Sequence, residues 1–268
     1  MTRYLFISGV GRSGTTALRN SLGMHPDIYY NGKENNIVQD LIAVAQKNIV
    51  MKSRNFALAV SPPTYYTAFE ELILQIIWPE KKLRKSKTLL AAVNLEPHLI
   101  ETLRDVFRAC RVVCLVRNGI GVISSRMKYR SFQDGEFAEH CQVWLRSTRM
   151  VKWAEENPEI GRVIRQEWFS DEERVTQEFL ELFQWAELPA NPQPAENILA
   201  RRYHPTDANE QTSNESHEKY GQLDVVERKA FELDRVDRWK SWSQQQQDYF
   251  VETCGEAMKS LGYSIPWI

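Results

Sequence analysis

The chain has 268 residues, 43% of them hydrophobic, and its 34 basic residues nearly balance its 35 acidic ones. A net charge of -1 gives no general reason to expect nucleic acid or an anionic membrane as a partner, so any anion site must be local. The length suits one large α/β domain over residues 1–268. No signal-peptide core or membrane-length apolar stretch is present, and we expect a soluble cytoplasmic protein without a membrane span.

A glycine-rich turn follows the first predicted strand. Tyr4–Ile7 form a short apolar run typical of a strand buried on both faces, and a helical pattern begins at Thr15. Gly9, Gly11 and Gly14 punctuate the tight turn between them. Because this order brings backbone N–H groups and the positive end of a helix dipole to one place, the stretch predicts an anion site.

This turn departs from the nucleotide-binding P-loop, G-x-x-x-x-G-K-[ST], at its lysine. Gly9, Gly14 and Thr16 have the P-loop spacing, but Thr15 occupies the lysine position. The cation is instead Arg12, inside the loop, whose planar guanidinium can engage two oxygens of a phosphate or sulfate at once. The loop therefore lacks the usual reach to β- and γ-phosphates.

Further along the chain, predicted strands alternate with predicted helices. Strands are expected at 28–30, 89–93, 112–116 and 162–165, and helices at 64–78, 98–109, after Gly121, at 137–156, at 172–185 and from Ser243 to Gly262. Residues 37–63 show no clear period and end at Pro62-Pro63, and residues 189–223 are expected to form a long irregular connection. The alternation indicates an α/β fold with a central parallel sheet flanked by helices, and ligands outside the carboxyl ends of its strands.

A second arginine is predicted at the same sheet edge as Arg12. Arg117 follows the strongest strand signal, Val112–Val116, so the two arginines suggest a ligand with two separated anionic groups. A metal-dependent P-loop kinase would need the loop lysine and a carboxylate at the position of Arg117. The four cysteines show no metal-ligand spacing, and we expect no metal site. The residues favour transfer of a group that needs no metal ion, such as a sulfuryl group.

Several segments of the sequence resemble the sulfotransferases that use 3′-phosphoadenosine-5′-phosphosulfate (PAPS). Residues 9–22, GVGRSGTTALRNSL, are similar to that family's 5′-phosphosulfate loop, and residues 112–127, VVCLVRNGIGVISSRM, to its 3′-phosphate motif. RQEWF at 165–169 stands where the family often has R-Y-E-D-L, and residues 236–264 resemble the C-terminal block of its bacterial members. The resemblance implies a three-layer P-loop-like fold, PAPS as donor, adenosine 3′,5′-bisphosphate (PAP) as product, and no metal.

The resemblance also implies a role for each matching residue of the donor site. The 5′-phosphosulfate is expected to be held, and charge on the transferred group stabilised, by Arg12, Ser13, Gly14, Thr15 and Thr16. The 3′-phosphate is expected to be clamped by Arg117 and Ser125, eight residues apart, and the nucleotide site to be completed by Arg238 and Trp239.

The resemblance assigns fewer residues to the acceptor site than to the donor site. Glu34 follows His25-Pro26-Asp27 much as the catalytic glutamate does in the tyrosylprotein-like branch, so the resemblance implies that it is the general base. The acceptor itself, a small molecule, lipid or glycan, is not identified, and neither is the oligomeric state.

One departure from the family pattern leaves alternatives open. Leu95 stands where many members have the lysine of a K-x-P motif, and either Lys33 or another cation compensates or the enzyme is built differently. His98 and His140 stay open as other bases. A non-catalytic relative that binds adenosine bisphosphate as a regulatory module is the alternative function.

Overall fold

The computed structural model describes residues 3–52, 61–80, 87–129, 132–202 and 237–268. Its centre is a five-stranded sheet in the order β2-β3-β1-β4-β5, in which every pairing is parallel. The strands are β1 (Tyr4–Ser8), β2 (Ile28–Glu34), β3 (Thr88–Val93), β4 (Cys110–Val116) and β5 (Gly161–Arg165). The predicted α/β class with a central parallel sheet is confirmed, and β1, which carries the glycine-rich loop, is its middle strand.

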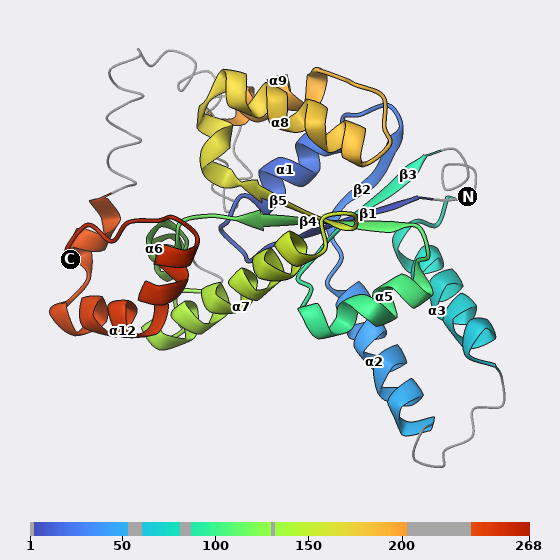
Figure 1. Cartoon of the computed structure of the whole chain (residues 1–268), viewed down its shortest axis with the longest axis horizontal. Helices are drawn as coiled ribbons and strands as arrows, with labels where there is room; N and C mark the ends of the chain where they lie inside the picture. The colour runs from blue at the N-terminus through green and yellow to red at the C-terminus, as the bar shows by residue number, and fades with distance from the viewer. Residues whose placement is uncertain (1–2, 53–60, 81–86, 130–131, 203–236) are drawn as a thin grey trace.

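Helices cover both faces of this sheet (Figure 1). One face carries α1 (Thr15–Leu22), α8 (Glu172–Trp185) and α9 (Gln193–Arg202), and the other carries α2 (Ile37–Lys52), α3 (Pro62–Ile77), α5 (Ile100–Val106) and α7 (Phe137–Glu156). At one end of the sheet lie α6 (Gly119–Lys128) and α12 (Gln244–Ser260). Within the described ranges, three short 3-10 helices connect these elements: η1 (Pro97–Leu99), η2 (Gln166–Ser170) and η3 (Asp237–Ser241). The layers are those of a P-loop-like fold.

The strands are apolar on both sides because helices pack on both sides. In β1, Tyr4 and Phe6 belong to the core beneath α3 and α5, whereas Leu5 and Ile7 belong to the core beneath α1 and α8. All five residues of β1 are buried. The continuous apolar run predicted a strand of this kind, since side chains alternate between two faces that are both dry.

A third core joins α6, α7 and α12 at the carboxyl ends of the strands. It holds Trp242, Phe250 and Trp267, whose rings lie 5.3 to 5.8 Å apart. The final helix begins as predicted: Ser243 and Gln246 form a reciprocal capping box. The C-terminal block is thereby folded against the helix that follows Arg117.

Three sequence expectations were wrong. Residues 37–52 form α2, whose apolar residues include exposed Ile37 and Val44 as well as buried Ile42, so no clean amphipathic period is visible. Pro62 and Pro63 begin α3, because the first helical positions need no N–H donor. Within the predicted irregular connection, α9 forms and packs against α1. Residues 81–86 and 203–236 lie outside the described residues.

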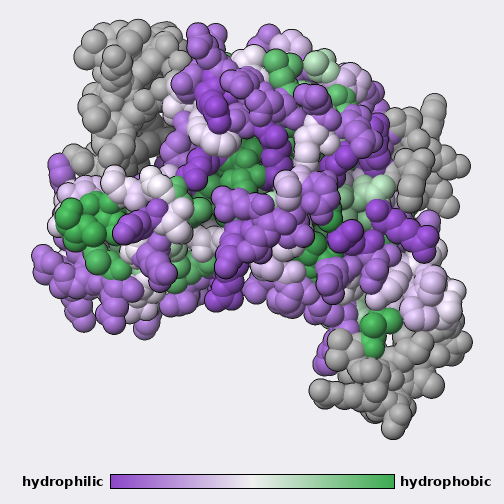
Figure 2. Space-filling view, in the orientation of Figure 1, coloured by the Kyte–Doolittle hydropathy of each residue, from purple (hydrophilic) through white to green (hydrophobic). Residues whose placement is uncertain are grey.

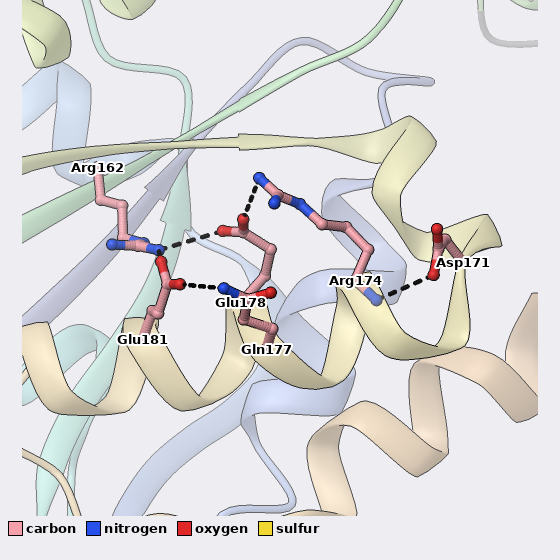
Figure 3. A network of polar contacts seen from close by, with 6 residues as sticks. All are labelled: Arg162, Asp171, Arg174, Gln177, Glu178 and Glu181. Carbon is pink, nitrogen blue, oxygen red and sulfur yellow. Dashed lines mark hydrogen bonds and ion pairs between the residues drawn. The ribbon is translucent and has the colours of Figure 1, made fainter.

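A polar network ties α8 to the edge strand β5 (Figure 3). The carboxylate of Glu178, which is buried, accepts a hydrogen bond from Arg162 of β5 at 3.1 Å and pairs with Arg174 at 2.7 Å. Glu181 also pairs with Arg162, at 2.8 Å. Because Arg162 bridges two carboxylates of one helix, the network fixes where α8 lies along the sheet.

The visible surface is mostly hydrophilic (Figure 2), and its hydrophobic residues form several separate groups, one of them near the C-terminal end of the chain. The described residues form no helix that combines the length and the apolar character needed to cross a bilayer.

Candidate functional site

The loop between β1 and α1 has the backbone of an anion cradle. Gly14, at the N-cap of α1, is left-handed with φ 99°, and Arg12 is also left-handed with φ 79°. A positive φ is costly for a residue with a β-carbon, and such strain is concentrated at functional sites. No side chain caps α1, so the first N–H groups of the helix face the loop without a side-chain acceptor among the described residues.

The hydroxyl residues of the loop fall into two groups. Ser13 is buried, and both its N–H and its Oγ–H donate to the carbonyl of Val10, at 3.1 and 2.7 Å. Ser13 therefore closes the turn and keeps only oxygen lone pairs for other partners. Thr15 is also buried, whereas Thr16 is exposed. Of the predicted hydroxyl ligands, Thr16 is the one most open to a bound anion.

Arg12, Arg117 and Ser125 meet at the carboxyl edge of the sheet. Nε of Arg12 donates to Oγ of Ser125 at 3.0 Å, and Nη1 of Arg117 donates to the Arg12 carbonyl at 3.1 Å. The guanidinium of Arg12 also lies over the ring of Tyr129, 4.3 Å from its centre. The two anion motifs predicted from distant parts of the sequence thus form one continuous cationic site.

Local structure around the start of α6 places Arg117. Asn118 caps the helix by accepting a hydrogen bond from the N–H of Ile120 at 2.9 Å. A β-carbon on Gly121 would lie 3.2 Å from Nε of Arg117, so the glycine leaves room for this side chain across the first turn. The indole of Trp144 donates to the Arg117 carbonyl at 3.0 Å.

Sequence reasoning gave no role to Glu167, which connects this helix to the C-terminal block. Its carboxylate accepts from the N–H of Asn118 at 2.8 Å and from the hydroxyl of Tyr263 at 3.0 Å. Burial and the neighbouring Glu167 raise the pKa of Tyr263. The RQEWF segment therefore holds the start of α6 in place, and the signal for it was its match to a family block.

Glu34 lies at the end of β2, beside a bulge. The register shifts between Tyr30, opposite Leu90, and Glu34, opposite Ala92, and Gly32 within the bulge is left-handed with φ 80°. Glu34 forms an ion pair with Arg19 of α1, Nη1 to Oε1 3.1 Å, in which the side chain of Arg19 is 11% exposed and that of Glu34 53%. β2 thus continues to Glu34, beyond the strand predicted at 28–30, and the ion pair of Glu34 joins it to α1 rather than to the loop.

The surroundings of Leu95 do not identify a cation that replaces the missing lysine. The positions of His98 and His140 do not identify either of them as the base. Leu95 is buried in the apolar core, and its N–H donates to Oγ of Ser8 at 3.2 Å. Lys33 is exposed. His98 is an exposed partner of Glu96, at 3.7 Å, and His140 is buried beside Arg126. No group of three or more potential metal-ligating side chains occurs in the part of the chain that the structure describes.

Trp239 lies in η3, which contacts α6. Its ring packs on Trp267 with 4.8 Å between centres, and its side chain is half-buried. The side chain of Arg238 is outside the described part of the structure. The assignment of both residues to the nucleotide site stays a prediction.

Comparisons with known proteins agree on the family and the fold. The family model described as "Sulfotransferase family" matches residues 5–169, which is more than half of the chain. A sulfotransferase domain from the Synechococcus PCC 7002 olefin synthase aligns over 98% of this chain and 95% of its own, at 14% identity and a TM-score of 0.57, and supports the fold. No curated protein matches the chain.

Two further solved structures align less well. Mouse sulfotransferase SULT7A1, complexed with PAP, is 13% identical over 97% of this chain and 88% of its own, with a TM-score of 0.47. STF9 from Mycobacterium avium is 12% identical over 98% and 78%, also with a TM-score of 0.47.

Proposed function

The chain belongs to the sulfotransferase family, and on this premise we propose that it moves a sulfuryl group from PAPS to a hydroxyl or amine of an acceptor. We also propose that residues 1–268 act as a single domain. The acceptor class stays broad at this point: a small molecule, a lipid or a glycan.

The observation that carries the proposal is the meeting of Arg12, Arg117 and Ser125 in front of an uncapped helix. Planar guanidinium groups and backbone N–H groups are the donors that phosphate and sulfate oxygens accept from. Gly14, at the turn of the loop, has a left-handed conformation that a residue with a β-carbon rarely adopts, and it directs the loop into the start of α1. The residues present therefore fit a nucleotide with two anionic groups.

In the proposed reaction, the acceptor oxygen forms a bond to sulfur while the bond from sulfur to the bridging phosphate oxygen breaks. The electron pair of that bond leaves on the 5′-phosphate, and PAP is released. Arg12 and the N–H groups at the start of α1 stabilise the negative charge on the leaving phosphate. Glu34 takes the proton of the acceptor, so that atoms and charge balance.

A non-catalytic PAP-binding module is the second candidate. It is favoured by one observation, the burial of Leu95 in the core where many relatives have a lysine. Loss of one cation from the site weakens stabilisation of the leaving group but leaves nucleotide binding possible.

Binding and turnover separate the candidates. We expect PAP to bind in the presence of EDTA, and Arg117→Ala to weaken binding at least tenfold, because a charge-assisted hydrogen bond contributes roughly 1.5–3 kcal/mol. Exposed Arg108 provides the control variant, Arg108→Ala, which should bind PAP normally. Equal binding by Arg117→Ala and the parent would contradict the site.

Release of PAP from PAPS is then measured with a panel of phenol, sterol, sugar and amine acceptors. Turnover that is lost in Glu34→Gln while PAP binding is kept supports the enzyme. The control is Glu101→Gln, at an exposed position. Tight PAP binding without any turnover favours the regulatory module.

A further inference from the structure

Arg126 is a buried cation next to the predicted 3′-phosphate residue Ser125. Only 7% of its surface is exposed. Its Nε donates to Nδ1 of His140 at 3.3 Å, and its guanidinium lies over the ring of Phe132, 4.1 Å from the ring centre. Both of these partners are uncharged side chains when His140 is neutral, so they position the guanidinium without neutralising it.

The setting of Arg126 repeats that of Arg12. Each arginine donates from Nε to a neutral acceptor, Ser125 or His140, and each rests its face on an aromatic ring. The two rings, Tyr129 and Phe132, lie 5.5 Å apart. Among the described residues, neither arginine has an ion pair with a carboxylate, so the two terminal nitrogens of each fork stay available for an oxyanion.

Arg126 is also in direct reach of the glycine-rich loop. A β-carbon on Gly11 would lie 3.5 Å from Nη1 of Arg126 and 3.1 Å from the ring of Phe132. Gly11 is the residue before Arg12. The absence of a side chain at this position leaves room for the ring of Phe132, over which the guanidinium of Arg126 lies beside the loop backbone.

A buried arginine without a bound carboxylate is costly to the protein. Burial lowers the pKa of Arg126, Glu139 raises it by its charge, and Arg146 lowers it. Glu139 therefore offsets the cost of burial in part, and a ligand that supplies further negative charge would offset more of it. The loop backbone at Gly11 lies next to this guanidinium, so an anion held by the loop can supply that charge.

We propose that Arg126 is a third donor-binding cation, which acts on the anion held by the glycine-rich loop and supplies the positive charge that Leu95 does not. This inference rests on the proposed function. It assigns the loop anion to Arg12 and Arg126 together, and the more distant phosphate to Arg117.

Three nucleotides test the assignment by calorimetry: PAP, adenosine 5′-monophosphate and adenosine 3′-monophosphate. Arg126→Met should weaken binding of PAP and of the 5′-monophosphate about tenfold or more, while binding of the 3′-monophosphate changes little. Arg117→Ala should show the reverse preference. Arg149→Met, at an exposed position of α7, is the matched control.

A second variant and a wild-type measurement guard against misfolding. Arg126→Lys keeps the charge and should retain part of the affinity that Arg126→Met loses. In the wild type, the arginine N–H resonances that contact the Phe132 ring should shift when the 5′-monophosphate is added and stay in place with adenosine. Unchanged resonances, or full affinity in a folded Arg126→Met, would overturn the inference.

The two proposals fail in different ways. If the wild type binds none of the three nucleotides, the proposed function fails and Arg126 has no donor to bind. If PAP binds and Arg117→Ala weakens it, but Arg126→Met does not, only the role of Arg126 is refuted.

Discussion

Nε of Arg12 donates a hydrogen bond to Oγ of Ser125 over 3.0 Å, although 113 residues separate them in the chain. The contact exists because β1 and β4 are neighbours in the sheet, so the loop after β1 and the helix after β4 share one edge. It joins the two halves of the proposed donor site.

Removing this contact should weaken PAP binding. In Ser125→Ala, Nε of Arg12 loses its acceptor, and we expect affinity to fall about five- to tenfold with a loss of about 1 kcal/mol in unfolding free energy. Ser124→Ala is the control, because Oγ of Ser124 is buried and has no hydrogen-bond partner among the residues that the structure describes. Calorimetry with PAP and urea unfolding measure the two effects, and equal affinities in the two variants would count against the site.

The ion pair between Arg19 and Glu34 should matter more for turnover than for stability. Because Glu34 is 53% exposed, we expect Arg19→Gln to cost no more than about 1 kcal/mol in unfolding free energy. Turnover should fall on the order of tenfold, since the carboxylate is no longer held in one orientation. Lys152→Gln, which breaks the exposed pair with Glu156, is the control. A fall in stability without a fall in turnover would make the pair structural.

His140 should make stability depend on pH. Burial, followed by the charge of Arg126, lowers its pKa below the ordinary 6.5, while Glu139 and the Gly135 backbone raise it. The unfolded chain therefore binds the proton more readily, so this contribution to stability is complete above pH 6.5 and is lost as the pH falls below that value.

His140→Gln tests this dependence, because its amide oxygen can still accept from Arg126 but does not titrate. Urea unfolding between pH 5 and 8 should show a smaller loss of stability at low pH in this variant than in the wild type. His98→Gln, at an exposed position, should keep the wild-type profile. Parallel profiles for all three proteins would exclude His140 as the source.

Glu178 should be the sensitive member of the network in Figure 3. Its side chain is 5% exposed and faces two arginines, so Glu178→Gln leaves both without their buried charge partner. We expect a loss of roughly 2–3 kcal/mol in unfolding free energy. Glu181→Gln, whose side chain is 44% exposed, should cost less than about 1 kcal/mol. Thermal and urea unfolding compare the two, and similar losses would contradict this ranking.

The sequence determined the elements whose signals are local. Each of these signals depends only on residues close together in the chain. They are the apolar run at β1, the glycines before α1 and the Ser243 cap, and each was found where it was predicted. Local signals failed for α2 and α9. Exposed apolar residues hid the helical period of α2, and α9 follows a proline-rich stretch.

The tertiary structure alone decided how the site is assembled. The sequence placed Arg12 and Arg117 at the ends of strands, but only the strand order puts β1 beside β4 and so brings Arg12 to Ser125. It could not reveal that Glu34 pairs with Arg19, since a bulge in β2 sets that contact. It gave no sign of Arg126, because an arginine in an amphipathic helix is usually exposed, and its burial results from packing against Gly11, Phe132 and His140.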